Sequence, residues 1–576
     1  MLAVCAALGA EAKPTVKTIA SPDGKLVVTV TVADDIRWSV EADGRTVLAP
    51  SQIAMQISDS ETWGEAPRLR KAVVGKIDET VEAPLYKKAE VEDKCTTLTL
   101  QFKGDYAVEF RAYDNAAAYR FVSTRKGDYT VKDEVAEFAF EGDNNVYCSY
   151  VRGNANKSIE QQYYNSFENT YEIEPMSKMG ANRLMFLPVL VDMGDRKVCI
   201  TESDLMSYPG MYLYNPDGGT ALKGNYAPVP DEVKQGGHNM LQGEVQTRKP
   251  YIAEVSGERS FPWRICIVAD SDAELLDNDM VFLLSHPNVI GDTSWIEPGK
   301  VAWEWWNDWG LYGVDFKPGI DNRTYKYYID FAARNGIEYV ILDEGWSVNL
   351  KADLMQVIPS IDIKELVDYG KERGVGIVLW GGYWAVNRDM DNVFKYYSDL
   401  GVKGFKIDFM DRSDQWMVDF YERVCREAAK NHLLVDLHGA FKPAGLEHKY
   451  PNLLSYEGVR GMEQMGGCTP DNSIYLPLMR NAVGPMDYTP GAMISMQPEC
   501  YRSERPNSAS IGTRAYQMAL FVLFESGIQM LADNPTLYYR NPDCTEFITS
   551  VPVTWDETRA IAAKTGEYLF VAKRKG

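Results

Sequence analysis

The sequence predicts a multidomain protein that combines an all-β part with an α/β part. The chain has 576 residues, of which 45% are apolar, and this length exceeds what a single compact core organises. Its pattern also changes near residue 300, from short runs that alternate apolar and polar residues to longer apolar runs separated by helical segments. We therefore expect an antiparallel β-sandwich, a parallel (β/α)8 barrel and a short β-rich end, in that order.

The first expected domain is the β-sandwich, over residues 13–270. Its short runs alternate apolar and polar residues, as in KLVVTVTV, LTLQF and AVEFRAY, and glycine, aspartate, asparagine and proline separate them. This alternation is typical of strands that bury one face of an antiparallel sheet. A linker over 271–299 follows, and its first half is a short helix in which Ser271 and Glu274 fit a capping box.

The second expected domain is the barrel, over residues 300–550. Six apolar runs predict its first strands, namely KVAWEWW, EYVILDEGW, GIVLWGGY, GFKIDFM, LLVDLHG and LLSYEGVRG. Helical segments separate the first five runs, and several of these segments end in glycine, which commonly terminates helices. Continuous apolar strands between helices indicate parallel strands that are buried on both faces. A closed barrel fits better than an open sheet, because no GxGxxG loop follows the first strand.

Two further strands complete the expected barrel. Strand seven is placed near Met486–Met493, and strand eight is GIQMLAD, which follows the helical segment TRAYQMALFVLFES. Over residues 551–576 the pattern returns to β, with EYLFVAKRKG as a strand. We interpret this last segment as the start of a C-terminal β-domain that is truncated.

The charge of the chain disfavours several classes of partner. The chain carries 60 basic and 82 acidic residues, which gives a net charge of −22. Such an acidic surface disfavours nucleic acid and anionic membranes, whereas a neutral substrate such as a sugar is compatible with it. No internal apolar run reaches about 18 residues, so no integral membrane span is expected.

The N-terminus, residues 1–12, reads as the remnant of a signal peptide. A short apolar stretch precedes Ala10-Glu11-Ala12, which fits a small-x-small cleavage site. Export places the expected protein in the periplasm, either free or associated with the outer membrane. A lipoprotein cysteine at Cys5 is the alternative, although Val4 is a poor residue before such a site. The nine cysteines show no metal-ligand spacing, and free thiols and disulfides both stay open.

Polar and aromatic residues follow the predicted barrel strands at their C-terminal ends, where the active sites of such barrels lie. Aromatic rings and carboxylates at one mouth suit a carbohydrate, because its apolar faces stack on rings and its hydroxyls bond to carboxylates. We expect the substrate to be bound by Trp303, Glu304, Asp343, Lys406 and His438.

Two carboxyl groups at this mouth fit glycoside cleavage, which needs a proton donor and a second carboxylate. Asp408 lies in the apolar run FKIDFM, where a carboxylate has no obvious packing role and Lys406 on the same face could keep it ionised. Glu463 follows the Gly-rich turn GVRGME, so its loop can reach across the mouth, and a catalytic acid there needs a raised pKa. The sequence contains no HExxH, GxSxG, P-loop or catalytic Cys–His pattern, so no motif of another catalytic class argues against glycoside cleavage.

Several blocks of the sequence together resemble glycoside hydrolase family 97, the exo-acting α-glycosidases of Bacteroides-type bacteria. The blocks occur in the family's order over nearly the whole chain and are SPDGKLVVTV, VAWEWWNDWG, YVILDEGW, GFKIDFMDRSDQ, VDLHGA, SYEGVRGME and GPMDYTPGAM. The resemblance implies an N-terminal β-super-sandwich, a catalytic (β/α)8 TIM barrel and a C-terminal β-domain. It also implies a calcium ion, Ca2+, at the catalytic centre.

The resemblance also implies roles for individual residues. Glu457 and Glu463 are the implied calcium ligands of the barrel, and Glu168 is the implied ligand of the N-terminal domain, with Glu172 nearby in the same short block. The motifs LDEGW and KIDF are similar to those of the retaining α-galactosidases of the wider clan. There the carboxylates of the first motif bind sugar hydroxyls, and the aspartate of the second, matched here by Asp408, is the nucleophile.

One block indicates the stereochemistry of the reaction. Inverting α-glucosidases of the family carry a base glutamate after strand five in a VDxHE-like block, whereas this chain reads VDLHGA and has Gly439 at that place. Retaining members carry an aspartate at the end of strand four, which Asp408 matches. The resemblance therefore implies a retaining exo-α-glycosidase that cleaves terminal α-galactosides by double displacement, with Asp408 as nucleophile and Glu463 as acid/base.

Two other functions stay open from the sequence. An α-glucosidase of the same family is the alternative within the enzyme class, and an inactive glycan-binding homologue of the same fold is the alternative outside it. The expected partners are α-linked galactoside oligosaccharides or glycoconjugates. The chain is expected to be a monomer or a small homo-oligomer.

Overall fold

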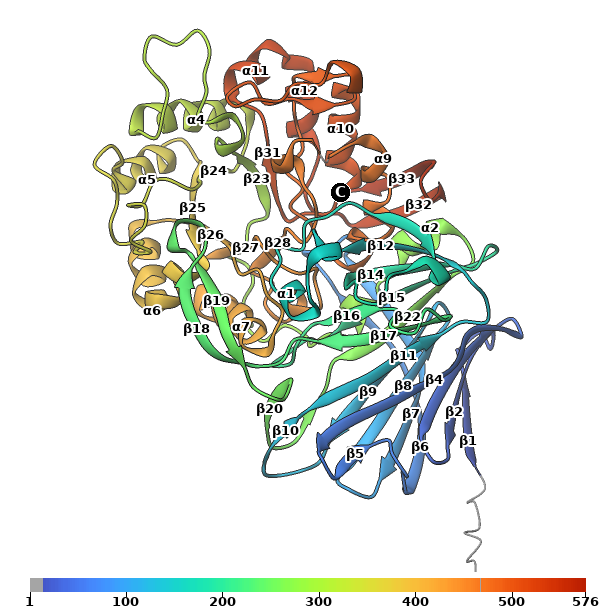
Figure 1. The fold of residues 1–576 in the computed structure, drawn as a ribbon. Coiled ribbons are helices and arrows are strands. Elements are labelled where there is room, and N and C mark those ends of the chain that lie inside the picture. Colours follow the sequence, from blue (N-terminus) through green and yellow to red (C-terminus); the bar gives the residue numbers. More distant parts are fainter. Residues whose placement is uncertain (1–13, 467) are drawn as a thin grey trace, which may run out of the picture.

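The computed structural model describes residues 14–466 and 468–576 and contains an all-β unit, a barrel unit and a small hairpin (Figure 1). The predicted signal segment, residues 1–12, lies outside the described residues, and export stays a prediction. Within the described ranges, no helix combines the length and the apolar character that crossing a membrane requires.

The N-terminal unit is an antiparallel β-structure whose strands pair in one continuous series. The series runs β1-β2-β3-β4-β11-β17-β16-β14-β15-β22-β9-β8-β7-β6, and shorter strands add to its edges. The strands of this network are β1 (Thr15–Ala20), β2 (Leu26–Val32), β3 (Ile36–Ala42), β4 (Arg45–Ser58), β5 (Glu61–Trp63), β6 (Leu69–Glu82), β7 (Glu90–Phe102), β8 (Tyr106–Tyr113), β9 (Ala116–Ser123), β11 (Asp133–Ala139), β12 (Asn145–Tyr150), β13 (Glu172–Pro175), β14 (Met185–Asp192), β15 (Lys197–Ser203), β16 (Met211–Tyr214), β17 (Ala221–Tyr226), β21 (Arg259–Ser260) and β22 (Trp263–Ala269).

This series folds back on itself, so that β1, β2 and β3 face β7, β8 and β9 across a core. In β2, Leu26, Val28 and Val30 are buried while the residues between them are partly exposed, which is the alternation that predicted a sandwich. Trp38 of β3 lies edge-on to Tyr119 of β9, with ring centroids 5.1 Å apart. The predicted all-β N-terminal domain is confirmed.

The barrel unit contains a parallel sheet in the order β28-β27-β26-β25-β24-β23-β31. Its strands are β23 (Gly299–Ala302), β24 (Tyr339–Leu342), β25 (Gly376–Gly382), β26 (Gly404–Asp408), β27 (Leu434–Leu437), β28 (Leu453–Tyr456) and β31 (Ile528–Leu531). The larger helices around it are α4 (Asn322–Asn335), α5 (Ile363–Lys371), α6 (Tyr383–Leu400), α7 (Gln415–Lys430) and α10 (Arg514–Leu523). Side chains of Asp321, Asp362, Asp414 and Thr513 cap four of these helices by accepting a backbone N–H bond. The parallel barrel is confirmed.

The predicted seventh strand differs from the structure. Residues 486–493 form no regular strand, although the Asp487 N–H donates to Tyr456 O of β28 (2.7 Å) and the Ala532 N–H donates to Pro490 O (2.9 Å). The segment therefore closes the barrel between β28 and β31 as irregular backbone. Pro485 and Pro490 have no N–H to donate to a neighbouring strand, which prevents a regular ladder there.

Short elements complete the structure. The linker holds α2 (Asp272–Asp277) and α3 (Met280–Leu283), and the predicted capping box at Ser271 is wrong, because the Glu274 carboxylate accepts from Asp270 N and Ser271 Oγ instead. The C-terminal hairpin packs on α2, where the Ala560 N–H donates to Asp277 (2.9 Å), and it confirms the return to β. The remaining elements are β32 (Glu557–Lys564), β33 (Tyr568–Arg574), β29 (Ser495–Met496), β30 (Ser510–Ile511), α8 (Leu446–Lys449), α9 (Pro470–Ser473), α11 (Pro535–Arg540) and α12 (Pro542–Ser550).

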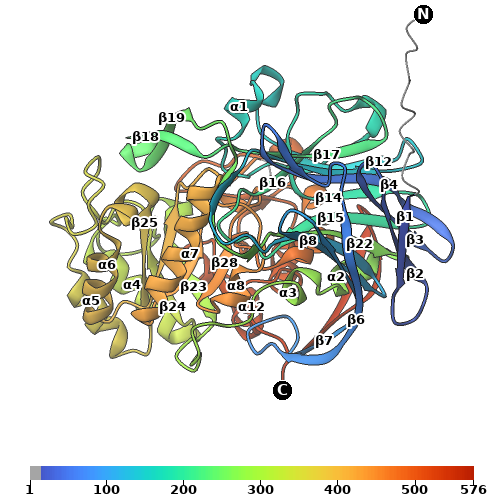
Figure 2. The ribbon, with the colours of Figure 1, turned by 90° about the horizontal axis from the view of Figure 1, so that it is seen from below.

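Two segments of the N-terminal unit reach the barrel at the C-terminal ends of its strands (Figure 2). One is the loop between β12 and β13, residues 151–171, which contains α1 (Ile159–Gln162) and whose Asn165 N–H donates to Asp411 O (3.0 Å). The other is the hairpin of β18 (Pro230–Gly236) and β19 (Gln242–Arg248), whose Leu241 O accepts from Trp384 N of α6 (2.9 Å). The small pair β10 (Asp128–Val131) and β20 (Ala253–Ser256) lies near the base of this hairpin. Both units therefore contribute residues to the barrel mouth.

Candidate active site

A cavity of about 450 Å³ opens at the C-terminal ends of the barrel strands, between the two units. Its barrel wall consists of Trp305, Asp343, Glu344, Trp380, Lys406, Asp408, Phe409, Asp411, Gly439, Glu457, Glu463 and Gln464. Its N-terminal wall consists of Lys157, Tyr164, Asn165, Ser166, Glu168 and Gln242. The sequence predicted most of the acids of the barrel wall, but of the N-terminal wall it predicted Glu168 alone.

Asp408 ends β26 and is held by two donors. Trp380 Nε1 donates to Asp408 Oδ2 (3.2 Å), and the backbone N–H of Phe409 donates to Asp408 Oδ1 (2.7 Å). Burial raises the pKa of the Asp408 carboxyl, while the nearby positive charges of His438 and Lys406 oppose this shift. Both carboxylate oxygens therefore have a fixed direction, and the group stays partly exposed to the cavity.

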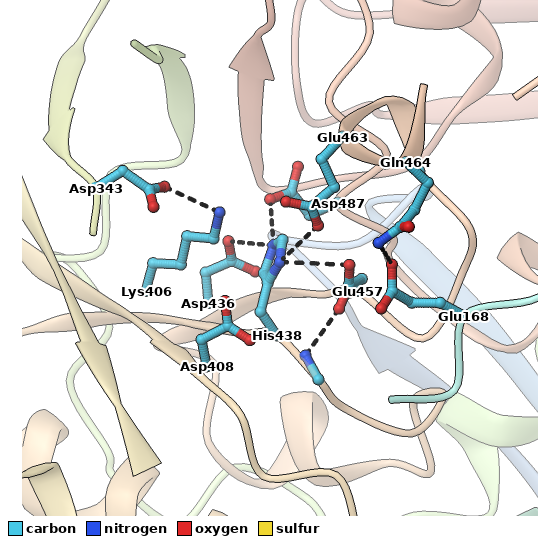
Figure 3. A network of polar contacts seen from close by, with 12 residues as sticks. Glu168, Asp343, Lys406, Asp408, Asp436, His438, Glu457, Glu463, Gln464 and Asp487 are labelled. Carbon is cyan, nitrogen blue, oxygen red and sulfur yellow. Dashed lines mark hydrogen bonds and ion pairs between the residues drawn. The ribbon is translucent and has the colours of Figure 1, made fainter. Parts of the chain in front are cut away.

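Asp343 follows β24 and forms a buried ion pair with Lys406 of β26 (Figure 3). Lys406 Nζ lies 3.1 Å from Asp343 Oδ2, Trp303 Nε1 donates to the same oxygen (2.7 Å), and the Glu344 N–H donates to Asp343 Oδ1 (2.7 Å). Burial alone would lower the pKa of Lys406, but the combined charges of Asp343, Glu463, Asp487 and Asp408 outweigh this effect and raise it well above its ordinary value. The cavity therefore presents a fixed carboxylate next to a fixed ammonium group.

Trp303 and Glu304 lie behind the barrel wall rather than in it, which corrects their predicted role in binding substrate. Both are completely buried, and neither lines the cavity. Glu304 Oε1 accepts from Tyr325 OH (2.6 Å) and from the Asp343 N–H (2.8 Å), while Glu304 Oε2 has no partner among the described residues. Burial, together with the charge of Asp343, raises the pKa of Glu304 to about 8. These two side chains hold Asp343 in place, and of the two neighbouring tryptophans Trp305, not Trp303, reaches the cavity.

His438 is also buried behind the wall, so its predicted contact with substrate is corrected as well. Its Nε2 lies 2.7 Å from Asp487 and 3.5 Å from Asp436, and its Nδ1 lies 3.5 Å from Glu463 and 3.7 Å from Glu457 (Figure 3). Burial and Lys406 alone would lower the pKa of His438, but Glu457 and Asp436 outweigh them and raise it well above its ordinary value. His438 therefore supplies positive charge beneath the carboxylates. The sequence did not single out Asp487, although it lies within the block GPMDYTPGAM.

Three glutamates converge on one side of the cavity. Glu168 comes from the 151–171 loop, Glu457 follows β28, and Glu463 lies in the short helical turn η5 (Met462–Gln464). Glu168 Oε1 accepts from Gln464 Nε2 (2.5 Å), and Glu457 Oε2 accepts from the Gly439 N–H (2.7 Å). Burial and their mutual repulsion raise the pKa of Glu168 to about 7 and that of Glu457 well above its ordinary value.

The pKa of Glu463 shifts in the direction opposite to the prediction. Burial alone would raise it, but the neighbouring Glu457 and His438 and the charge of Lys406 lower it below its ordinary value. The expectation of a raised pKa for this carboxyl is therefore wrong, because Glu457 and Glu168 are the members of the cluster that retain a proton most readily.

The three glutamates fit a divalent cation that prefers oxygen ligands. Carboxylates from both units are buried against one another here, an arrangement whose repulsion a cation relieves. The candidate ligand atoms of His438, Glu457 and Glu463 lie within 4.8 Å of one another, and His438 Nδ1 has no hydrogen-bond partner among the residues described. Glu172, the neighbour of Glu168 in the same block, instead pairs with Arg183 (2.9 Å) and does not line the cavity.

Comparison with known proteins identifies the family. The model of the glycoside hydrolase 97 family matches residues 305–459, and that of its N-terminal domain matches residues 19–287. The chain belongs to glycoside hydrolase family 97. A retaining α-galactosidase of Bacteroides thetaiotaomicron is 48% identical over 565 residues, which cover 97% of this chain and 85% of that protein. A probable retaining α-galactosidase of Streptomyces bingchenggensis is 30% identical over 93% of this chain and 78% of its own length.

A solved family 97 structure shares the fold. The enzyme from Pseudoalteromonas sp. strain K8 in complex with acarbose superposes with a TM-score of 0.83 at 23% identity, over 97% of this chain and 87% of that one. Family 97 membership makes this chain a glycoside hydrolase. Asp408 and Glu463, the two carboxyl groups expected from the sequence to act in glycoside cleavage, both line the cavity at the barrel mouth.

Proposed function

We propose that this family 97 enzyme is a retaining exo-α-galactosidase with Asp408 as its nucleophile. The observation that carries the proposal is the setting of Asp408, whose two oxygens are aimed by Trp380 and Phe409 into a cavity that also holds Glu463. A carboxylate with fixed direction at the end of a barrel strand suits attack on an anomeric carbon. The names of the two relatives, a retaining and a probable retaining α-galactosidase, support the same choice.

The backbone at Gly439 supports a retaining rather than an inverting reaction. Gly439 has a φ of 56°, and a Cβ atom there would lie 2.8 Å from Asp411 Oδ1 and 3.0 Å from the Phe409 nitrogen. A glutamate at this position would be strained and would clash with backbone, so a base that activates water from this side has no place.

The proposed reaction has two displacements. In the first, Asp408 bonds to the anomeric carbon while the glycosidic bond breaks and Glu463 gives a proton to the leaving oxygen, so Glu463 has to be protonated before this step in spite of its lowered pKa. In the second, Glu463 takes a proton from water, the water oxygen bonds to the anomeric carbon, and the ester to Asp408 breaks. Each step inverts the anomeric carbon, so the released sugar keeps the α configuration.

Asp343 and Lys406 are the proposed sugar-binding pair. Asp343 and Lys406 line the cavity while their partners lie behind the wall, so these two groups face the sugar hydroxyls without having to reorganise. Trp305 adds an aromatic face, and residues of the N-terminal unit line the side of the cavity away from the barrel.

We also propose that Glu168, Glu457 and Glu463 hold calcium. When bound, the ion supplies positive charge that stabilises negative charge on the leaving oxygen. The convergence of buried glutamates from both units supports this ligand set. Metal analysis of the purified protein, and a rise in unfolding temperature with added calcium after chelation, test it independently of activity. A protein that contains no metal and shows no shift in unfolding temperature contradicts the proposal.

Aryl α-galactoside and aryl α-glucoside, assayed side by side, test the proposed substrate. We expect hydrolysis of the galactoside, and proton NMR should detect α-galactose as the first product. Preferential hydrolysis of the glucoside would favour the α-glucosidase alternative. β-Galactose as the first product would overturn the retaining mechanism, and with it the role of Asp408.

A further inference from the structure

The opening of the cavity is edged by basic side chains, although the chain as a whole has a net charge of −22. Lys157 lines the cavity, and Arg152 and Arg460 line an adjoining surface groove of about 580 Å³. The guanidinium carbon of Arg505 lies 3.3 Å from the ring centroid of Trp305, which is part of the barrel wall. We call Arg152, Lys157, Arg460 and Arg505 the basic rim.

The members of the basic rim have no acidic partner. Within the part of the chain that the structure describes, none of the four has a carboxylate oxygen within 4.0 Å. Other arginines near the same loop are paired, since Arg183 contacts Glu172 and Glu174 and Arg248 contacts Glu160. Unpaired positive charge is therefore a particular feature of the rim rather than of the loop in general.

The rim residues come from three segments that meet beside Glu463. Arg152 and Lys157 flank one turn, η1 (Asn154–Asn156), and Lys157 Cε lies 3.8 Å from the Cβ position of Gly153. Arg460 Nη1 donates to Gln464 Oε1 (3.4 Å), and Gln464 follows Glu463 directly. The charge of Arg505 acts on the Glu463 carboxylate as well. Gln464 lines the cavity and Arg460 lines the groove, so the contact between these two residues joins the groove and the cavity.

The position beside Glu463 places the rim on the side of the leaving group. Glu463 is the proposed proton donor to the leaving oxygen, so the part of the substrate that departs lies on its side of the cavity. The carboxylates deeper in the cavity already face Lys406 and His438. Asp471 is the one acid among the residues that line the groove, against Arg152 and Arg460. The leaving-group side thus carries an excess of positive charge.

We propose that the natural leaving group is an acidic saccharide, one that bears a carboxylate or a sulfate ester. This inference rests on the proposed α-galactosidase function and names the substrate class of that site. Guanidinium groups bind carboxylate and sulfate oxygens in a bidentate manner, and a lysine adds a point charge. Tyr171 and Tyr475 in the same groove offer ring faces for the sugar, with centroids 6.2 Å apart.

Matched disaccharides test the proposal. Galactose α-linked to glucose, to glucuronate and to glucose 6-sulfate, all with the same linkage, should be compared by kcat/KM, with an aryl α-galactoside as reference. We expect the better of the two acidic substrates to exceed the neutral one by about fivefold or more at low ionic strength. The two acidic arms show whether carboxylate or sulfate is preferred. The preference should fall as salt is raised, because Arg152 is exposed and the other rim residues are partly exposed, so that salt screens their charge.

Rim variants and a charge-matched control connect the preference to these residues. Arg152→Gln and Lys157→Gln should each lower the acidic-to-neutral ratio by about two- to fivefold, and their combination should bring it close to one. Arg152→Gln should leave hydrolysis of the aryl α-galactoside unchanged. Lys71→Gln makes the same change of charge on exposed β6, far from the cavity, and should leave the ratio unchanged.

Three results would overturn the proposal. The first is an equal kcat/KM on acidic and neutral disaccharides. The second is a loss of the acidic-to-neutral preference in Lys71→Gln as large as that in the rim variants. The third is a loss of kcat/KM in the rim variants by the same factor on acidic and neutral substrates, which would mean that the rim only balances the charge of the cavity. Failure to cleave any aryl α-galactoside would instead contradict the proposed function. In that event, calorimetry can still compare the affinities of the native enzyme and of Arg152→Gln for the glucuronate disaccharide. Equal affinities would show that Arg152 of the rim does not bind the acidic sugar.

Discussion

The two walls of the cavity hold their polar groups in different ways. In the barrel wall, Asp343 directly follows a parallel strand and Asp408 ends one, and each accepts from at least two donors of fixed direction. In the N-terminal wall, Glu168 lies on the 151–171 loop, after Phe167 with a φ of 59°. The difference fits the roles proposed above. The group proposed to bond to the sugar lies on a rigid strand end, and the proposed contacts with the cation and the leaving group lie on a loop.

The walls also differ in how their charges are balanced. The acids of the barrel wall face Lys406 and His438, which are buried and carry positive charge. Glu168 faces Glu463 and Asp408, and its pKa of about 7 reflects burial and repulsion by these two carboxylates. Joining the walls therefore requires positive charge at their meeting point, which is where we propose calcium.

The largest expected effect tests the barrel wall. Asp408→Gly removes the proposed nucleophile and should lower kcat on an aryl α-galactoside by about 10⁴-fold or more, because no covalent intermediate can form. Added azide fits the space that the carboxylate leaves and should restore turnover, with a β-galactosyl azide as product. Circular dichroism of the variant serves as the folding control. Loss of activity without rescue, in a folded variant, would count against the nucleophile role.

A smaller loss is expected at the second fixed carboxylate of this wall. Asp343→Asn removes the negative charge that pairs with Lys406 and bonds to sugar hydroxyls, so kcat/KM should fall by about 10²-fold. Asp353→Asn, a change of the same type at a partly exposed position on the loop after β24, serves as the matched control. Near wild-type efficiency of Asp343→Asn would show that the sugar is bound elsewhere.

The barrel wall was largely predictable from the sequence, and the reason is geometric. Parallel strands appear as continuous apolar runs, and a polar residue at the end of such a run must lie at the mouth, as Asp343 and Asp408 do. The sequence cannot tell whether such a residue points into the cavity or away from it. Trp303 and Glu304 lie beside Trp305 in the chain, yet only Trp305 reaches the cavity.

The N-terminal wall was largely unpredictable, because its residues are distant in sequence from the barrel and lie in irregular backbone. Gln242 donates to Asp411 across 169 positions of the chain, and no local pattern marks either end of that contact. Glu168 was found through family resemblance alone. Strand seven was misjudged for a related reason, since its backbone bonds to both neighbours without forming a regular ladder.

A third prediction tests the N-terminal wall. Glu168→Gln removes one proposed ligand and should weaken calcium binding by about 10- to 100-fold, measured by calorimetry and by the shift in unfolding temperature with added calcium. Glu172→Gln changes the neighbouring glutamate, which pairs with Arg183 outside the cavity, and should leave calcium affinity unchanged. Equal affinities in the two variants would mean that the N-terminal wall holds no ion.

The smallest expected effect concerns stability and tests the support behind the barrel wall. Burial raises the pKa of Glu304 to about 8, whereas a glutamate in the unfolded chain titrates near its ordinary pKa of 4.5. Between these values the unfolded chain has lost the proton that the folded chain keeps, so stability falls as pH rises, by at most about 1.4 kcal/mol per pH unit. Below pH 4.5 both states are protonated and the contribution to stability is fully present.

Glu304→Gln imitates the protonated acid and removes this dependence. Its amide carbonyl can accept from Tyr325 and from the Asp343 N–H as Glu304 Oε1 does, and its NH₂ group takes the place of the unpartnered Oε2. The free energy of unfolding, measured with urea at pH 5, 6, 7 and 8, should therefore rise in the variant relative to the native enzyme as pH rises. Parallel pH profiles would mean that Glu304 is ionised when folded. Asp343 would then lie next to a second negative charge. The acids of the barrel wall would then be no better balanced by positive charge than those of the N-terminal wall.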